Sequence, residues 1–269
     1  ETGKVQEFSI YDVEKTNNVP ISKQDITTGE EIEGAKLELL DSKGKVIESW
    51  TSTTKPHVIN NLKAGTYTIR EKVAPKGYLL AEDIEFTIDA EGNITGSTIM
   101  QDDYTKVEIS KKDIVTSEEL PGATLQVIEK STGKVLEEWT STAEPYKINK
   151  LPIGEYILRE ITAPDGYVRA EDVEFKVDKT GEIQRVEMKD DYTKVEISKK
   201  DLETKEILEG AQLQLLNSQG DVVAEFTSEN KAYTISKLPV GEYTLHEVKA
   251  PKGYNLAEDV KVVIEETGK

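Results

Sequence analysis

The sequence predicts an all-β protein built from small β-sandwich or β-barrel domains in tandem. Three observations support this: one long pattern recurs along the chain, apolar and polar residues alternate with a period of two within each copy, and turn residues separate these short runs. No long stretch keeps the 3.6-residue period of an amphipathic helix. Each copy is far longer than a solenoid unit, so we expect separate domains in an elongated array.

Two sets of motifs define the copies. The first set is Val-x-Ile-Ser-Lys-x-Asp, which stands at residues 19–25, 107–113 and 195–201 and gives a period of 88 residues (107 − 19 and 195 − 107). The second set is Tyr-x-[Ile/Leu]-x-Glu-x-x-Ala-Pro-x-Gly-Tyr, which stands at residues 67–78, 156–167 and 243–254. We therefore place repeat 1 at 17–104, repeat 2 at 105–192 and repeat 3 at 193–269.

Repeat 3 lacks the last strand that the other repeats contain. The first four residues, Glu-Thr-Gly-Lys, are the same as residues 266–269, and Gly3 precedes Asp12 by the nine positions that also separate Gly181 from Asp190. We therefore expect residues 1–16 to hold the last strand of a preceding repeat, or a strand that complements repeat 3 of another molecule. A secretion-vector remnant is the competing explanation for the first three residues.

Composition excludes several function classes. The net charge of −18 opposes binding to nucleic acid and to an anionic membrane surface, and its simplest role is solubility. The absence of cysteine excludes disulfides, thiolate metal sites and cysteine nucleophiles. No apolar run is long enough for membrane insertion. We expect no cofactor and no metal, because the repeated Ala-Glu-Asp segments offer too few oxygen ligands for calcium.

Ionisable side chains fall on the apolar faces of the expected strands. Lys111 shares a face with Val107 and Ile109, because side chains two residues apart on a strand point the same way. Gln24 replaces the second lysine of the pair in repeat 1, so the first lysine is the inward one. The inward sets are Lys23, Glu71 and Asp102 in repeat 1, Lys111, Glu160 and Asp190 in repeat 2, and Lys199 and Glu247 in repeat 3, with Asp12 left over.

A lysine, a glutamate and an aspartate that are buried together can react with one another. Burial lowers the pKa of a lysine and raises that of a carboxyl group, which yields a neutral, nucleophilic amine beside a protonated, electrophilic carboxyl. The glutamate can polarise the aspartate and move the proton, and loss of water would leave a neutral amide. Two interpretations stay open from the residues alone: a self-made Lys–Asp amide, or a buried or rim salt bridge in which no bond forms.

The second motif resembles the E-box of Gram-positive pilins. Together with Ile-Ser-Lys-x-Asp, it is similar to the CnaB (SpaA-type, prealbumin-like) repeats of cell-wall-anchored surface proteins. The resemblance implies immunoglobulin-like or prealbumin-like β-sandwiches in which a first-strand lysine bonds to a last-strand aspartate. Carried over, it implies the bonds Lys23–Asp102 and Lys111–Asp190, with Glu71 and Glu160 as catalysts.

Repeat 3 departs from that pattern, because Lys199 and Glu247 have no Asp partner downstream on a last strand like those of repeats 1 and 2. They are candidates for remaining unpaired or for an intermolecular bond to Asp12 of another molecule. Such a bond would produce head-to-tail self-association through residues 1–12 and repeat 3.

The resemblance also implies a function. It indicates a structural stalk of a surface adhesin or pilus-like protein, extracellular and anchored to the cell wall of a Gram-positive bacterium. Other domains would contact host extracellular matrix or cell-surface proteins. The alternative is a module that itself binds a host ligand through an exposed sheet or loop surface. A turnover enzyme is not expected, because the reactive set would consume itself.

Overall fold

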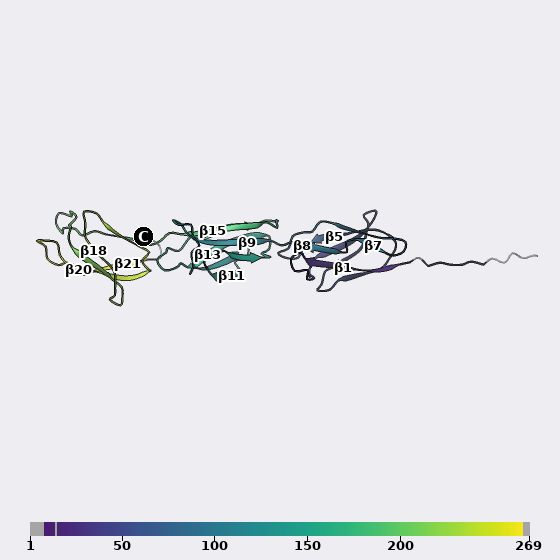
Figure 1. Ribbon diagram of the computed structural model, residues 1–269, viewed down its shortest axis with the longest axis horizontal. Coiled ribbons are helices and arrows are strands. Elements are labelled where there is room, and N and C mark those ends of the chain that lie inside the picture. The colour runs from purple at the N-terminus through teal and green to yellow at the C-terminus, as the bar shows by residue number, and fades with distance from the viewer. Residues whose placement is uncertain (1–7, 14, 266–269) are drawn as a thin grey trace, which may run out of the picture. The chain divides into compact units, whose positions relative to one another are not determined.

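The computed structural model describes residues 8–13 and 15–265, and every helix or strand assigned in that part of the chain is a β-strand. The described residues form two compact units. One contains the residues up to Lys106 with Ile148–Ile153 and Val177–Ile183, and the other contains Val107–Lys147, Gly154–Lys176 and the residues from Gln184 onward. Figure 1 shows the strands as arrows along the chain. The predicted all-β class is confirmed.

Repeat 1 is a sandwich of two sheets. A three-stranded sheet has the order β4-β1-β8, and a five-stranded sheet has the order β3-β2-β5-β6-β7. β1 pairs antiparallel with β4 and parallel with β8, so the first and last strands are neighbours. The strands are β1 (Asn17–Asp25), β2 (Lys36–Asp41), β3 (Val46–Thr51), β4 (His57–Leu62), β5 (Gly65–Val73), β6 (Ile84–Ile88), β7 (Ile94–Gly96) and β8 (Ile99–Asp102).

The core of repeat 1 lies between these two sheets. Val19 and Ile21 on β1 are buried in the same cluster as Leu37 and Leu39 on β2. Each pair is spaced by two residues, as expected where one face of a strand packs inward and the other faces outward. Lys23 occupies the next inward position on β1, so its amine enters the core along an apolar face.

Repeat 2 has the same plan. Its sheets have the orders β12-β9-β15 and β11-β10-β13-β14. The strands are β9 (Lys106–Asp113), β10 (Thr124–Glu129), β11 (Val135–Thr140), β12 (Tyr146–Asn149), β13 (Gly154–Thr162), β14 (Val173–Val177) and β15 (Ile183–Asp190).

Repeat 3 has a smaller first sheet. Among the described residues this sheet contains only β16 and β19, and the second sheet has the order β18-β17-β20-β21. No described strand of repeat 3 corresponds to β8 or β15. The strands are β16 (Lys194–Ile197), β17 (Gln212–Leu216), β18 (Val222–Thr227), β19 (Tyr233–Ser236), β20 (Gly241–Lys249) and β21 (Val260–Ile264).

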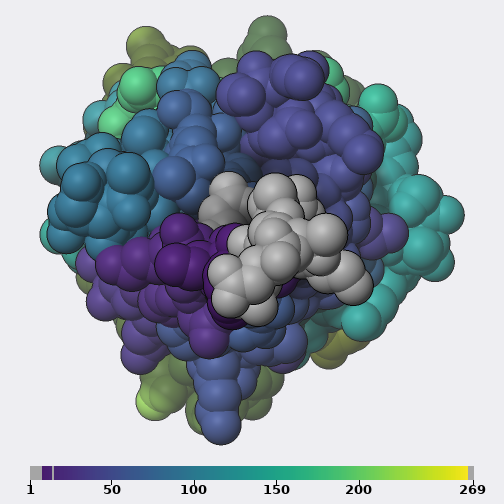
Figure 2. Space-filling model, turned by 90° about the vertical axis from the view of Figure 1, so that its right-hand side faces the viewer, coloured from purple at the N-terminus to yellow at the C-terminus, as the bar shows by residue number. Residues whose placement is uncertain are grey.

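The segment before β1 is exposed. Residues 8–13 belong to no strand, and Phe8 and Ile10 are 87% and 93% exposed. Figure 2 shows the face of the molecule that carries the purple N-terminal residues. Within this chain the segment therefore completes no sheet. The first seven residues lie outside the described part of the chain, so a complementing strand at 1–12 stays a prediction.

Candidate functional site

Three strands of repeat 1 bring the predicted side chains together. Lys23 lies opposite Met100 in the parallel pair of β1 and β8, and Asp102 follows two residues later on the same face. Glu71 is on β5 of the other sheet, opposite Leu37. The set therefore lies between the two sheets of the sandwich, in the core.

The contacts in repeat 1 join the amine to both carboxyl groups. Lys23 Nζ donates a hydrogen bond to Asp102 Oδ1 and lies 3.1 Å from Glu71 Oε1. The three residues are 1%, 0% and 4% exposed, in the order lysine, aspartate, glutamate. The structure places these three side chains together in the core, and bond formation between them remains a prediction.

Repeat 2 reproduces this arrangement. Lys111 Nζ donates a hydrogen bond to Asp190 Oδ1 and lies 2.9 Å from Glu160 Oε1. All three residues are buried. The same geometry thus recurs at the same strand positions in two repeats.

The electrostatics of the site favour a neutral aspartate. Burial raises the pKa of Asp102 to about 7, against the lowering effect of Lys23, and Glu71 adds to the rise. The pKa of Asp190 is raised to about 7 for the same reasons. Among the described residues, Oδ2 of each aspartate has no hydrogen-bond partner, which makes the ionised form still less favourable.

Each glutamate is held in place by a backbone amide. The strand pattern of the sequence does not predict this contact. Glu71 Oε2 accepts a hydrogen bond of 2.7 Å from the N–H of Ala81, and Glu160 Oε2 accepts one of 2.6 Å from Ala170. This bond fixes one glutamate oxygen and leaves the other facing the lysine. The signal was present as the constant ten-residue spacing between the box glutamate and the Ala-Glu-Asp segment.

The aspartate of that segment has a structural partner. Arg70 makes a two-pronged contact with Asp83, and Arg159 makes the same contact with Asp172. Each arginine is next to the site glutamate in sequence but on the opposite face of the strand. Within the described part of the chain, no group of three or more His, Cys, Asp or Glu side chains could hold a metal ion.

Repeat 3 has an incomplete set. Lys199 Nζ lies 2.9 Å from Glu247 Oε1, and Glu247 Oε2 accepts a 2.6 Å hydrogen bond from the N–H of Ala257. The Lys199 side chain is 16% exposed. Asp12 is exposed and outside any strand. Lysine and glutamate thus come together here without an aspartate among the described residues.

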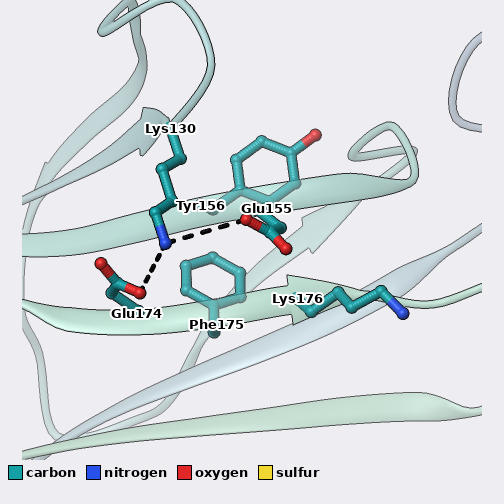
Figure 3. A pocket seen from close by; sticks show the side chains of 6 residues that line it. All are labelled: Lys130, Glu155, Tyr156, Glu174, Phe175 and Lys176. Atoms are coloured by element: carbon teal, nitrogen blue, oxygen red, sulfur yellow. Dashed lines mark hydrogen bonds and ion pairs between the residues drawn. The ribbon is translucent and has the colours of Figure 1, made fainter.

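A surface pocket of repeat 2 offers no comparable chemistry. It measures about 230 Å³ and is open to solvent (Figure 3). Lys130 Nζ lies 2.6 Å from Glu174 Oε2 and 3.8 Å from Glu155 Oε2, while the rings of Tyr156 and Phe175 stack 5.5 Å apart. The exposed amine is flanked by two carboxylates, so its charge is already balanced.

No described helix is long and apolar enough to span a bilayer.

Comparison with known proteins gives the following matches. The family model described as "SpaA: Prealbumin-like fold domain" matches residues 17–103, 105–192 and 193–269. Among solved structures, the chain is similar to the Bacillus anthracis TIE protein, with 26% identity and a TM-score of 0.48 over 94% of this chain and 49% of that one. It thus spans about half the length of that protein.

Two pilins also match. The Streptococcal ancillary pilin has 14% identity and a TM-score of 0.39, over 93% of this chain and 96% of that one. The shaft pilin SpaA from Lactobacillus rhamnosus GG has 17% identity and a TM-score of 0.35, over 66% of this chain and 98% of that one. No curated protein matches the chain.

Proposed function

The chain belongs to the SpaA family of prealbumin-like fold domains, and on that premise we propose that it is a stalk segment of an extracellular surface or pilus-like protein of a Gram-positive bacterium. In this proposal repeats 1 and 2 each form one internal Lys–Asp amide. The observation that carries the proposal is the buried amine of Lys23 in contact with both Asp102 and Glu71, repeated at Lys111.

The proposed reaction is a single dehydration. The neutral Nζ of Lys23 attacks Cγ of protonated Asp102, the new C–N bond forms, and the C–O bond to the hydroxyl breaks. Glu71 takes a proton from the attacking nitrogen and returns it to the departing hydroxyl, so water leaves and the glutamate is regenerated. The raised pKa of Asp102 supports this route, because the protonated carboxyl is the electrophile and needs no ATP or external activation to lose water.

The position of the bond suits a mechanical role. Lys23 and Asp102 are 79 residues apart and lie on the adjacent first and last strands of repeat 1. Tension that enters through β1 would leave through the amide and β8, so the strands between them would carry little load. The absence of cysteine means that no disulfide can play this part.

One exposed apolar position that the three repeats share supports a stalk over a dedicated binding module. The equivalent strands β3, β11 and β18 each begin with an exposed valine. These residues are Val46, Val135 and Val222, which are 42%, 42% and 51% exposed. A ligand-binding repeat would be expected to differ from its neighbours on such a surface.

Intact-mass spectrometry of the unfolded protein tests the proposal. We expect the mass of the monomeric chain to fall below the sequence mass by two waters, by one water in Glu71→Gln, and by none in the variant that also carries Glu160→Gln. Wild-type protein with the full sequence mass would contradict it. A boiled gel tests the further proposal that Asp12 bonds to Lys199 of a second molecule: a covalent ladder that disappears in Asp12→Ala is expected, and a single monomer band would refute it.

A further inference from the structure

A lysine of repeat 2 is held by an acid and two aromatic rings of repeat 1. Lys150 follows β12 and belongs to the same compact unit as repeat 1. Its Nζ lies 2.8 Å from Asp25 Oδ2 and 4.7 and 5.3 Å from the ring centroids of Tyr78 and Tyr104. Tyr78 also donates its hydroxyl hydrogen to Asp25 Oδ2 at 2.9 Å. Ion pairing and cation–π attraction therefore act on one amine.

The same contact recurs one repeat later, within the other compact unit. Lys237 Nζ lies 3.2 Å from Asp113 Oδ2 and 4.8 and 5.4 Å from the ring centroids of Tyr167 and Tyr192. It also donates a hydrogen bond of 2.6 Å to the Tyr167 hydroxyl. The same residue types thus make the same contact in two repeats, and we name this arrangement the Asp–Tyr site.

The backbone makes room for this lysine. Lys150 and Lys237 have φ of +65° and +60°, so both lie in the left-handed region. A Cβ on Gly77 would lie 2.1 Å from the carbonyl oxygen of Lys150, and a Cβ on Gly166 would lie 2.6 Å from that of Lys237. The glycine of the Ala-Pro-x-Gly-Tyr motif thus allows the loop of the following repeat to approach closely.

The acid of the site is strongly ionised. Burial opposes the charge on Asp25, but hydrogen bonds from Lys150, from the Thr27 backbone and from Tyr78 outweigh it and lower its pKa to about 2. The pKa of Asp113 is lowered as well, with Tyr167 as the largest contributor. A permanently charged, largely buried carboxylate is suited to binding an amine.

Repeat 3 carries a third copy of the Asp–Tyr pair. Tyr254 donates to Asp201 Oδ2 at 2.9 Å, and Asp201 Oδ1 accepts from the backbone of Glu203 and Thr204, as Asp25 does from Thr27 and Thr28. Within the described residues no lysine contacts this pair, and a Cβ on Gly253 would meet no atom within 4 Å. No described residue therefore occupies, beside Gly253, the place that a lysine loop takes beside Gly77 and Gly166.

We propose that the Asp201–Tyr254 pair is a docking site for a further domain of this family. That domain would carry a lysine with positive φ directly before its Leu-Pro segment, at the position of Lys150 and Lys237. In repeat 1 that position is Asn61, with φ of +61°, so a second copy of this chain presents the right backbone without the amine. The site would therefore discriminate between domains by one side chain. This proposal does not depend on the Lys–Asp amides.

Zero-length carbodiimide coupling between full-length chains tests the proposal. Asn61→Lys protein is mixed with wild-type protein, and cross-linked peptides are identified by mass spectrometry. Coupling of Lys150 to Asp25 and of Lys237 to Asp113 within each chain serves as the internal positive control. We expect coupling of the introduced amine to Asp201 at several times the yield obtained with Asn60→Lys, which adds the same charge at the neighbouring position.

Two further variants make the result decisive. Asp201→Asn in the accepting chain should abolish the cross-link, and Gly253→Ala should reduce it because a Cβ would obstruct the incoming loop. A melting temperature close to the wild-type value shows that each variant is folded. Equal yields from Asn61→Lys and Asn60→Lys, coupling to other carboxylates, or no intermolecular coupling would each overturn the proposal.

Discussion

Repeats 1 and 3 place the same lysine–glutamate pair in different surroundings. In repeat 1 the strand β8 covers Lys23, which is 1% exposed, and supplies Asp102. In repeat 3 no such strand is described, and the Lys199 side chain is 16% exposed. The pair nevertheless forms at 2.9 Å in repeat 3. The last strand is therefore not needed to bring lysine and glutamate together. It buries the amine and adds the electrophile.

Removing the aspartate from the site of repeat 1, so that only lysine and glutamate remain as in repeat 3, should have the largest effect on stability. Asp102→Ala removes the proposed cross-link over 79 residues, and we expect the free energy of unfolding of repeat 1 to fall by about 4–5 kcal/mol in the chain-entropy model. Denaturant unfolding measures this loss, and the mass should show one dehydration instead of two. Glu247→Gln in repeat 3 is the matched control, because it should leave both dehydrations in place. An unchanged stability of repeat 1 would contradict a covalent bond there.

A change of pH should distinguish the bonded from the unbonded site. In Glu71→Gln the Lys23 and Asp102 side chains remain but the amide should not form. In the wild type, burial raises the folded pKa of Asp102 to about 7 and Glu71 adds a smaller part of the rise. Burial, the largest cause, remains in the variant, so the pKa stays raised and above pH 4 the folded state keeps a proton that the unfolded chain releases. Stability from this group is therefore complete at low pH and is lost as the pH rises.

The size of this loss follows from the pKa difference. It amounts to about 1.4 kcal/mol per pH unit, and at most about 4 kcal/mol in total for one site. Urea unfolding of the variant and of wild-type protein, measured across this range, gives the difference directly. In the wild type the proposed amide does not titrate, so the stability gap should widen with pH. A constant gap would contradict an unbonded, protonated Asp102 in the variant.

The sequence was sufficient for the fold class and for the inward members of the site. The alternation of inward and outward positions along a strand places Asp102 and Asp190 inward and their neighbours Asp103 and Asp191 outward. In the structure Asp102 and Asp190 are buried, and Asp103 pairs with Lys106 at 2.9 Å. This alternation arises because a strand fixes the direction of every side chain.

Two further contacts could not be predicted from the alternation of inward and outward positions along a strand. The amide of Ala81 reaches Glu71 from a loop, and Lys150 reaches Asp25 from another repeat. Neither contact follows from an alternating pattern within one strand, because each joins segments distant in sequence. Aligning the repeats could have drawn attention to these residues, although their partners become visible only in the folded chain.

Substitutions on the outward face of β5 and of the equivalent strands should have the smallest effect on stability. Arg70 meets Asp83 and Arg159 meets Asp172, whereas in repeat 3 His246 meets Asp259 at 2.7 Å. The Arg70 and Asp83 side chains are 42% and 39% exposed, so solvent and salt screen the pair. A double-mutant cycle with Arg70→Ala and Asp83→Ala should therefore give a coupling free energy below about 1 kcal/mol, falling further in high salt. Both variants should keep two dehydrations in the intact mass, because this pair lies on the face opposite Glu71. A lost dehydration would show that the outward pair positions the glutamate, and the two faces of the strand would then act as one site.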